Sequence, residues 1–135
     1  MSQYTAPIRD MQFVMRELAN LEGVAGLPGC EEVSPDLVDA ILDEAGKFAG
    51  GVLAPLNKIG DQEGAKWKDG QVSTAPGWKD AYTQFAESGW TALACDPQYG
   101  GQGLPKLIST AVMEMWKSAN MAFSLCPMLT TGAIE

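Results

Sequence analysis

Residues 34–53, SPDLVDAILDEAGKFAGGVL, have the pattern of one long amphipathic helix together with its start. Ser34 is a good N-cap, Pro35 suits the first helical position, and Asp36 is favoured near the positive end of the helix dipole. Apolar residues then recur at helical spacing and predict a buried face. That face holds Leu37, Ile41, Ala45, Phe48 and Val52, and it is widened by Val38 and Leu42.

Three prolines mark the expected limits of helices. Pro55 is predicted to kink or end the long helix near Ala54, because proline lacks an amide hydrogen and its ring clashes with the preceding turn. Pro105 is predicted to open a later helix, and Pro127 to interrupt the helical pattern that follows it. The buried side of the helix after Pro105 is expected to hold Leu107, Ile108, Ala111, Val112, Met115 and Ala119.

Two more segments have helical spacing. Near the N-terminus, a helix that ends before Gly23 has a face made of Met11, Val14, Met15 and Leu18. Further along, a helix closed by Gly89 at its C′ position has a face made of Trp78, Ala81, Tyr82 and Phe85. A glycine- and proline-rich stretch separates the first helix from the rest, so we expect residues 1–30 to form an N-terminal helical arm that packs outside the core.

The remaining signals complete the predicted fold. Asp69-Gly70 fits a tight hairpin turn between 67–68 and 71–72, although such short strands need packing to be stable. The sequence therefore predicts an all-α fold, an irregular bundle of four to six helices with Gly- and Pro-rich loops and room for one short hairpin. Residues 130–135 are largely apolar and lack a stop signal, so we expect a truncated piece of a longer protein.

Composition and charge limit the partners. The chain has 135 residues, 46% of them hydrophobic, which is enough for one core and too much for a disordered chain. Its formal net charge of −8 repels nucleic acid and anionic lipid, so we expect neither as a partner. No run approaches the ~18 apolar residues of a membrane span, and no secretory signal opens the chain. We expect a cytoplasmic protein, or one in the lumen of an organelle.

The ionisable side chains exclude several kinds of active site. The chain has no His, which removes the usual zinc sites and the Ser-His and Cys-His triads. The widely spaced Cys30, Cys95 and Cys126 fit buried thiols in a reducing compartment rather than a disulfide framework. No pair of carboxylates stands out for proton transfer. We therefore assign no catalytic residue and no metal ligand.

Two features are open to a functional or a structural interpretation. Residues 100–103, GGQG, lack the glycine spacing and the buried strand of nucleotide-binding loops, so we favour a flexible tight turn over a phosphate site. The seven Met and four Trp fit core filling better than a ligand pocket in general. A pocket is favoured at the C-terminal end, where Pro127 is surrounded by Met121, Phe123, Met128 and Leu129.

The segment Pro97-Gln98-Tyr99-Gly100-Gly101-Gln102-Gly103 resembles a loop of the acyl-CoA dehydrogenase family. In that family, the loop follows a segment like Glu87-Ser88-Gly89-Trp90 and precedes a long apolar helix, and all three parts occur here in order. Residues 4–13, YTAPIRDMQF, resemble the longer-chain branch, which includes bacterial enzymes acting on methylthiopropionyl-CoA. The resemblance covers essentially the whole chain.

The resemblance implies the N-terminal helical domain of an FAD enzyme that desaturates an acyl-CoA thioester between Cα and Cβ. In the family, a glutamate takes the α-proton and the flavin takes a hydride. The flavin and this glutamate are held mainly by a middle β domain and a C-terminal helical domain. The motifs of those two domains are absent here. The resemblance thus implies that residues 31–135 are a truncated domain, inactive alone and unable to hold FAD well, from an enzyme that is a homo-oligomer.

In the family, this domain also helps to wall the acyl-chain pocket. Counting from the glycine loop along the next helix places the wall near Phe123, Cys126, Pro127 and Thr130. The alternative is a non-catalytic helical module whose apolar faces bind a protein partner. The sequence does not fix the acyl group, the electron acceptor or the oligomeric state.

Overall fold

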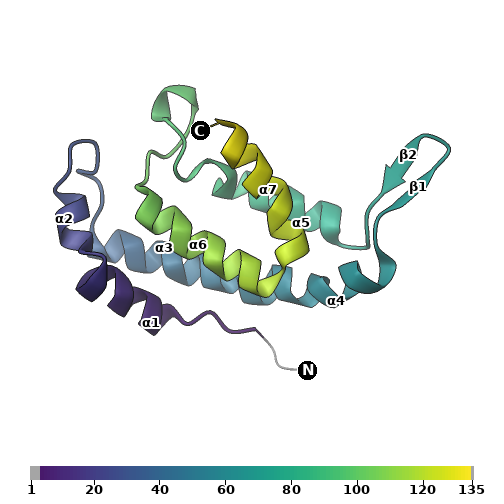
Figure 1. Cartoon of the computed structure of the whole chain (residues 1–135), viewed down its shortest axis with the longest axis horizontal. Coiled ribbons are helices and arrows are strands. Elements are labelled where there is room, and N and C mark those ends of the chain that lie inside the picture. The colour runs from purple at the N-terminus through teal and green to yellow at the C-terminus, as the bar shows by residue number, and fades with distance from the viewer. Residues whose placement is uncertain (1–3, 135) are drawn as a thin grey trace.

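The computed structural model describes residues 4–134 and shows the predicted irregular helical bundle with one short hairpin (Figure 1). Residues 1–3 and 135, the outermost parts of the expected arm and domain, lie outside the described residues. The helices are α1 (Ile8–Phe13), α2 (Leu21–Ala25), α3 (Pro35–Phe48), α4 (Ala54–Glu63), α5 (Trp78–Glu87), α6 (Lys106–Ala119) and α7 (Met121–Ile134). The strands are β1 (Lys66–Lys68) and β2 (Gln71–Ser73).

α3 begins as predicted, because the Ser34 hydroxyl accepts a hydrogen bond from the Leu37 amide at 3.2 Å. Its buried stripe runs beside the predicted one. The fully buried side chains are Val38, Leu42, Ala45, Ala49 and Leu53. The predicted residues Ile41, Phe48 and Val52 flank this stripe and are half-buried. α3 therefore buries a wide face, as a helix at the centre of a bundle must.

Of the two outcomes predicted at Pro55, a kink or an end of the long helix near Ala54, the end is wrong. A π-helical turn, Ala49–Leu53, joins α3 directly to α4, so the chain stays helical as far as Glu63. The wider turn accommodates the ring of Pro55, which lies at the start of α4. The irregularity expected at this proline is therefore a change of helix type and not a break.

The first helix also contains a π-helical turn, Val14–Leu18, which overturns its predicted face. Met11 and Met15 are buried as expected, but Val14 is 46% exposed and Leu18 is 72% exposed. A π turn uses more residues than an α turn, so the side chains after it point in a different direction. The helix ends at Leu18, before Gly23 as predicted, and Gly23 lies in the separate helix α2.

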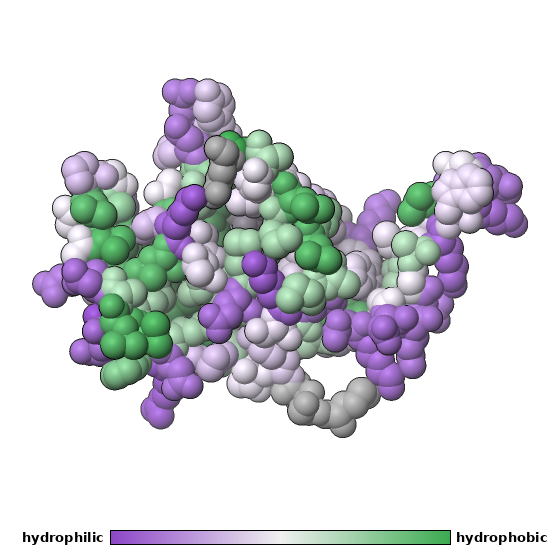
Figure 2. Space-filling view, in the orientation of Figure 1, coloured by the Kyte–Doolittle hydropathy of each residue, from purple (hydrophilic) through white to green (hydrophobic). Residues whose placement is uncertain are grey.

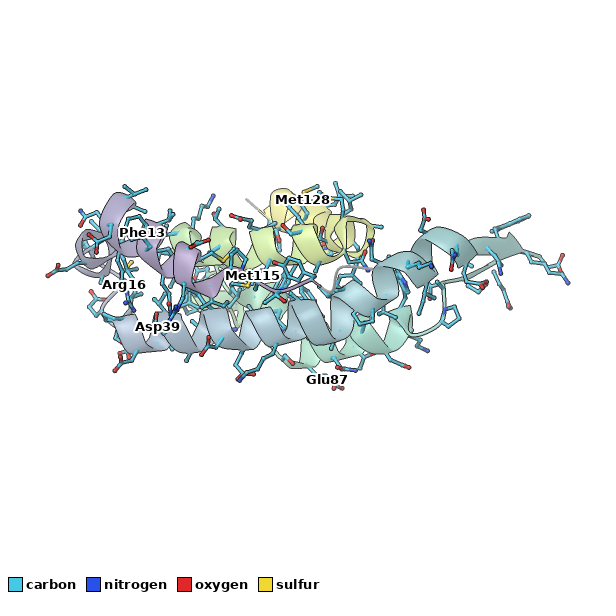
Figure 3. The ribbon with its side chains drawn as sticks, turned by 90° about the horizontal axis from the view of Figure 1, so that it is seen from below. Phe13, Arg16, Asp39, Glu87, Met115 and Met128 are labelled. Atoms are coloured by element: carbon cyan, nitrogen blue, oxygen red, sulfur yellow. The ribbon has the colours of Figure 1, made fainter. Side chains whose placement is uncertain are left out.

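The N-terminal arm packs on α3 and shares its core, contrary to the expectation that it packs elsewhere. Met11, Met15 and Leu21 belong to the same buried cluster as the α3 side chains. Arg16, in the π-helical turn after α1, forms an ion pair with Asp39 of α3 at 2.6 Å, and Figure 3 shows the two residues next to each other. The domain boundary at residue 30 stays a prediction.

Residues 4–8 cross the glycine-containing face of α3 and of the π turn that follows it. A Cβ on Gly46 would lie 3.0 Å from the Ile8 side chain, and one on Gly50 would lie 3.2 Å from the Tyr4 carbonyl oxygen. The small residues therefore allow the N-terminal segment to approach the helix closely. Burial, with a smaller effect of the Glu114 charge, raises the pKa of the Tyr4 hydroxyl.

An aromatic cluster occupies the centre of the core. Phe85 of α5 contacts Trp116 of α6 edge-to-face at 4.7 Å and Phe123 of α7 at 5.7 Å between ring centroids. Phe48 and Trp78 extend the cluster toward α3 and the start of α5. These contacts join the helices that surround the candidate site.

α6 buries its predicted face, except for the half-buried Leu107, and adds Trp116.

The predicted hairpin is confirmed and projects away from the bundle (Figure 1). Asp69 and Gly70 have φ of 51° and 79°, as its two-residue turn requires. Trp67 pairs with Val72 across the strands, and both side chains are more than two-thirds exposed.

Candidate functional site

A cavity of about 440 Å³ lies between α6, α7 and residues 90–96. We call it the α6–α7 groove. α6 contributes Lys106, Ser109, Thr110, Met113, Trp116 and Lys117. α7 contributes Ser124, Pro127, Thr131 and Ile134. The third wall is made of Trp90, Thr91, Leu93, Ala94, Cys95 and Asp96, with Phe85 behind it.

α7 lines the groove because it runs through a proline that was expected to interrupt it. The helix continues from Met121 to Ile134 with Pro127 inside it, so the predicted interruption is wrong. Its first turn is anchored by Phe123, which is 3% exposed and packs on three aromatic rings. Core packing of this kind can offset the loss of one helical hydrogen bond, which costs about 3 kcal/mol with the ring clash.

The glycine loop holds the third wall in place. The Gln102 amide donates to the Ala92 carbonyl at 2.9 Å, the Gly103 amide to Cys95 at 3.0 Å, and the Leu104 amide to Leu93 at 2.8 Å. The loop is thus bonded to the wall and is less free than the sequence suggested. Gly100 and Gly103 have positive φ, which confirms the turn interpretation at those two positions.

The groove is chemically suited to apolar ligands. Three of its hydroxyls donate to carbonyls of their own helices: Ser109 to Lys106, Ser124 to Met121, and Thr131 to Pro127. Those hydroxyls therefore offer a ligand only acceptor lone pairs. The Trp116 indole nitrogen is buried and has no acceptor among the described residues. Aromatic and aliphatic side chains supply much of the remaining surface, as is typical of pockets for small apolar groups, and Asp96, Lys106 and Lys117 also line the groove.

The structure brings together only part of the residue set predicted from spacing. Pro127 lines the groove, whereas Phe123 lies in the core behind it. Cys126 and Thr130 are exposed on a neighbouring face of α7 and do not line the groove. All four lie on one helix, but of the side chains of α7 only Phe123 and Ser124 are buried.

Several groove residues were missed from the sequence. Ser124, Thr131 and Ile134 share a helix face with Pro127, at a spacing that is visible once α7 is treated as continuous. Trp116 lies four residues after Val112, on the face that was already predicted to be buried. Nothing in the sequence placed residues 90–96 against α7, since that contact is made by the fold.

The described residues hold no candidate metal site at the groove. Over residues 4–134, no three His, Cys, Asp or Glu side chains come together as a metal site. No helix in this part of the chain is long and apolar enough to cross a membrane.

Comparison with known families shows which family the chain belongs to. The profile of the acyl-CoA dehydrogenase N-terminal domain matches residues 36–135, about three-quarters of the chain. The chain belongs to this family. The groove is thus a feature of an acyl-CoA dehydrogenase N-terminal domain, and the profile begins at the second residue of α3.

Individual relatives point the same way. The chain is 43% identical over 132 residues to a 3-methylmercaptopropionyl-CoA dehydrogenase of Ruegeria pomeroyi. The aligned region covers 98% of the chain and 22% of that protein. It is 28% identical over 134 residues to a butyryl-CoA dehydrogenase of Syntrophomonas wolfei, covering 96% of the chain and 22% of the relative. It is 27% identical over 124 residues to a broad-specificity linear acyl-CoA dehydrogenase of Mycobacterium tuberculosis, covering 90% of the chain and 20% of the relative.

The match includes the N-terminal arm, because 98% of the chain aligns with the Ruegeria protein while the family profile starts at residue 36. The chain spans about a fifth of the length of the curated relatives it matches. An acyl-CoA dehydrogenase N-terminal domain is therefore what the chain represents.

Proposed function

We propose that this chain is the N-terminal helical domain of an FAD-dependent acyl-CoA dehydrogenase and that the α6–α7 groove walls the acyl chain of the substrate. The groove is the observation that carries the proposal. It is a largely apolar cavity of about 440 Å³ in a chain that belongs to this family. The proposed reaction is the α,β-desaturation of an acyl-CoA thioester.

The glycine loop does not suit the phosphates of the flavin cofactor. The backbone amides of the glycine loop would be the natural phosphate donors, but those of Gly101, Gln102 and Gly103 are bonded to Asp96, Ala92 and Cys95 carbonyls. A phosphate group would find no free amide there. We therefore propose that the flavin and the catalytic base are held by other parts of the complete enzyme, and that this chain alone is inactive.

Charge supports a role at the acyl end of the substrate. The net charge of −8 disfavours the phosphates of coenzyme A over most of the surface. The acyl group is apolar and matches the groove. The names of the relatives span butyryl, linear and 3-methylmercaptopropionyl thioesters. We propose 3-methylmercaptopropionyl-CoA as the first substrate to test, because the Ruegeria protein has the higher identity of the three.

The residues predicted from spacing remain part of this proposal. Pro127 would contact the acyl chain directly, and Phe123 would support that wall from the core. Cys126 and Thr130 lie on the exposed face, and we propose that they contact the chain's outer end or a neighbouring part of the complete enzyme. Free cysteines suit a cytoplasmic location, and the family resemblance supports a homo-oligomer.

Filling the groove tests the proposal. In the complete enzyme, Thr131→Trp should raise KM for longer acyl-CoA substrates about tenfold, since lost pocket space excludes the chain, with flavin content unchanged. Thr83→Trp, on the exposed side of α5, is the matched control and should leave KM unchanged. Steady-state kinetics over a series of acyl chain lengths measures both. A wild-type enzyme that oxidises no acyl-CoA would favour the helical interaction module instead.

A further inference from the structure

We propose that Asn120 is a positioning residue, which sets the angle between the two helical walls of the α6–α7 groove and thereby the acyl-chain preference. This inference rests on the proposed function and adds a residue that determines its specificity. Asn120 does not line the groove, so it would act through the residues of α7 that do.

Asn120 is the single residue between α6 and α7. α6 ends at Ala119 and α7 begins at Met121. The backbone of Asn120 has φ −156° and ψ 89°, which is not helical, so the chain changes direction at this residue. Figure 1 shows the two helices diverging from this point. The relative orientation of the two groove walls therefore depends on how Asn120 is held.

Both polar atoms of the Asn120 side chain are used, and the residue is only 1% exposed. Its carbonyl oxygen accepts from the Phe123 amide at 3.0 Å, which caps α7. Its amide nitrogen donates to the Leu53 carbonyl at 3.1 Å, 67 residues away in sequence. Leu53 is the fully buried last residue of the π turn between α3 and α4. One side chain thus caps α7 and tethers it to the long central helix.

A small tilt at this joint has a large effect at the groove. At ~1.5 Å of rise per residue, Thr131 lies about 16 Å along α7 from Asn120, so a tilt of about 4° moves it by about 1 Å. Displacements of that size alter how well a bound group is placed for reaction. Pro127 lies closer to the joint and would move less. The tether should therefore matter most for longer acyl groups, which reach the outer part of the groove.

Two substitutions separate the tether from the cap. Asn120→Ser keeps a good N-cap oxygen for α7, but its side chain is too short to reach the Leu53 carbonyl. Asn120→Ala removes both bonds. If the hydrogen bond to Leu53 sets the angle between the two groove walls, both variants should change substrate preference alike. If only the cap matters, Asn120→Ser should behave as the wild type does.

The measurement is the ratio of kcat/KM for octanoyl-CoA to that for butyryl-CoA in the complete, flavin-loaded enzyme. We expect both variants to change this ratio about three- to tenfold, the size of one lost hydrogen bond, mainly through KM and with little change in kcat or flavin absorbance. Asn57→Ser, at an exposed position of α4, is the control and should change nothing. An unchanged ratio in Asn120→Ser overturns the proposal.

Amide hydrogen exchange gives a second readout that does not depend on activity. In Asn120→Ser, the amides of α7 should exchange faster than in the wild type, while those of α3 should not. Equal exchange rates in α7 would also overturn the proposal. A wild-type enzyme that does not oxidise acyl-CoA would refute the proposed function. Hydrogen exchange would then still test whether the bond between Asn120 and Leu53 holds α7 in place.

Discussion

At the scale of single residues, Gly101 shows how one missing side chain allows the groove wall to form. A Cβ at this position would lie 2.0 Å from the Cys95 carbonyl oxygen, far inside van der Waals contact. The close approach lets the Gly101 amide bond to Asp96 at 3.1 Å and the Gly103 amide bond to Cys95. Gly100, by contrast, needs glycine for its φ of 84° and has open space around it.

Gly101→Ala should therefore destabilise the 135-residue chain by about 3 kcal/mol, because the backbone of the loop must move and its bonds to residues 90–96 must break. Gly132→Ala in α7 is the matched control. It has nothing within 4 Å of the added methyl and should stabilise the helix by about 0.5 kcal/mol. Urea unfolding followed by circular dichroism measures both, and equal midpoints for the two variants would contradict the steric argument.

At the scale of elements, regular helices were predictable and irregular ones were not. The buried face of α6 follows from its even spacing, and the start of α3 follows from Ser34 and its neighbours. The π turns at Val14–Leu18 and Ala49–Leu53 leave no comparable sign in composition, and each shifts the side chains after it. α7 is continuous through Pro127, and its first turn packs in the core through Phe123, a tertiary contact that local sequence does not reveal.

The same limit applies to the candidate site. Family resemblance and helical spacing pointed to α7, and Pro127 does line the groove. Ser124 and Thr131 were missed because the helix was expected to be interrupted between them. The wall at residues 90–96 was missed because hydrogen bonds to a loop ten residues later hold it there.

Pro127→Ala tests the cost of the proline inside α7. The substitution restores an amide hydrogen to the helix and removes the ring clash, while the unfolded chain gains entropy, so we expect a net stabilisation of about 1–2 kcal/mol. Pro76→Ala in the exposed loop before α5 should change stability by less than about 0.5 kcal/mol. The urea midpoint of the 135-residue chain is the measurement, and a lower midpoint for Pro127→Ala would show that the ring contributes more through packing than it costs.

At the scale of the whole molecule, α7 stands out as a helix without any charged residue on an otherwise acidic protein. Met121, Leu125 and Leu129 are 53%, 44% and 70% exposed. Figure 2 shows hydrophobic side chains gathered over α7. A helix that is apolar on all sides is normally covered by other protein, and patches of this kind promote association.

The 135-residue chain on its own should therefore self-associate. Replacing Leu125 and Leu129 together with Lys should keep it monomeric at concentrations where the wild type forms larger species, because the charges interrupt the apolar patch. Light scattering after size-exclusion chromatography measures the mass. Trp67→Lys with Val72→Lys, on the exposed hairpin, is the control. A wild-type chain that stays monomeric, or a hairpin variant that alone prevents association, would assign the contact elsewhere.

The hairpin offers a practical consequence of its own. Its turn at Asp69-Gly70 stands clear of the bundle, and none of the strand side chains is buried. Residues inserted there would extend into solvent without displacing any helix, since exposed turn tips tolerate additions. A fluorophore or affinity peptide attached at this turn would label the chain while leaving the α6–α7 groove undisturbed.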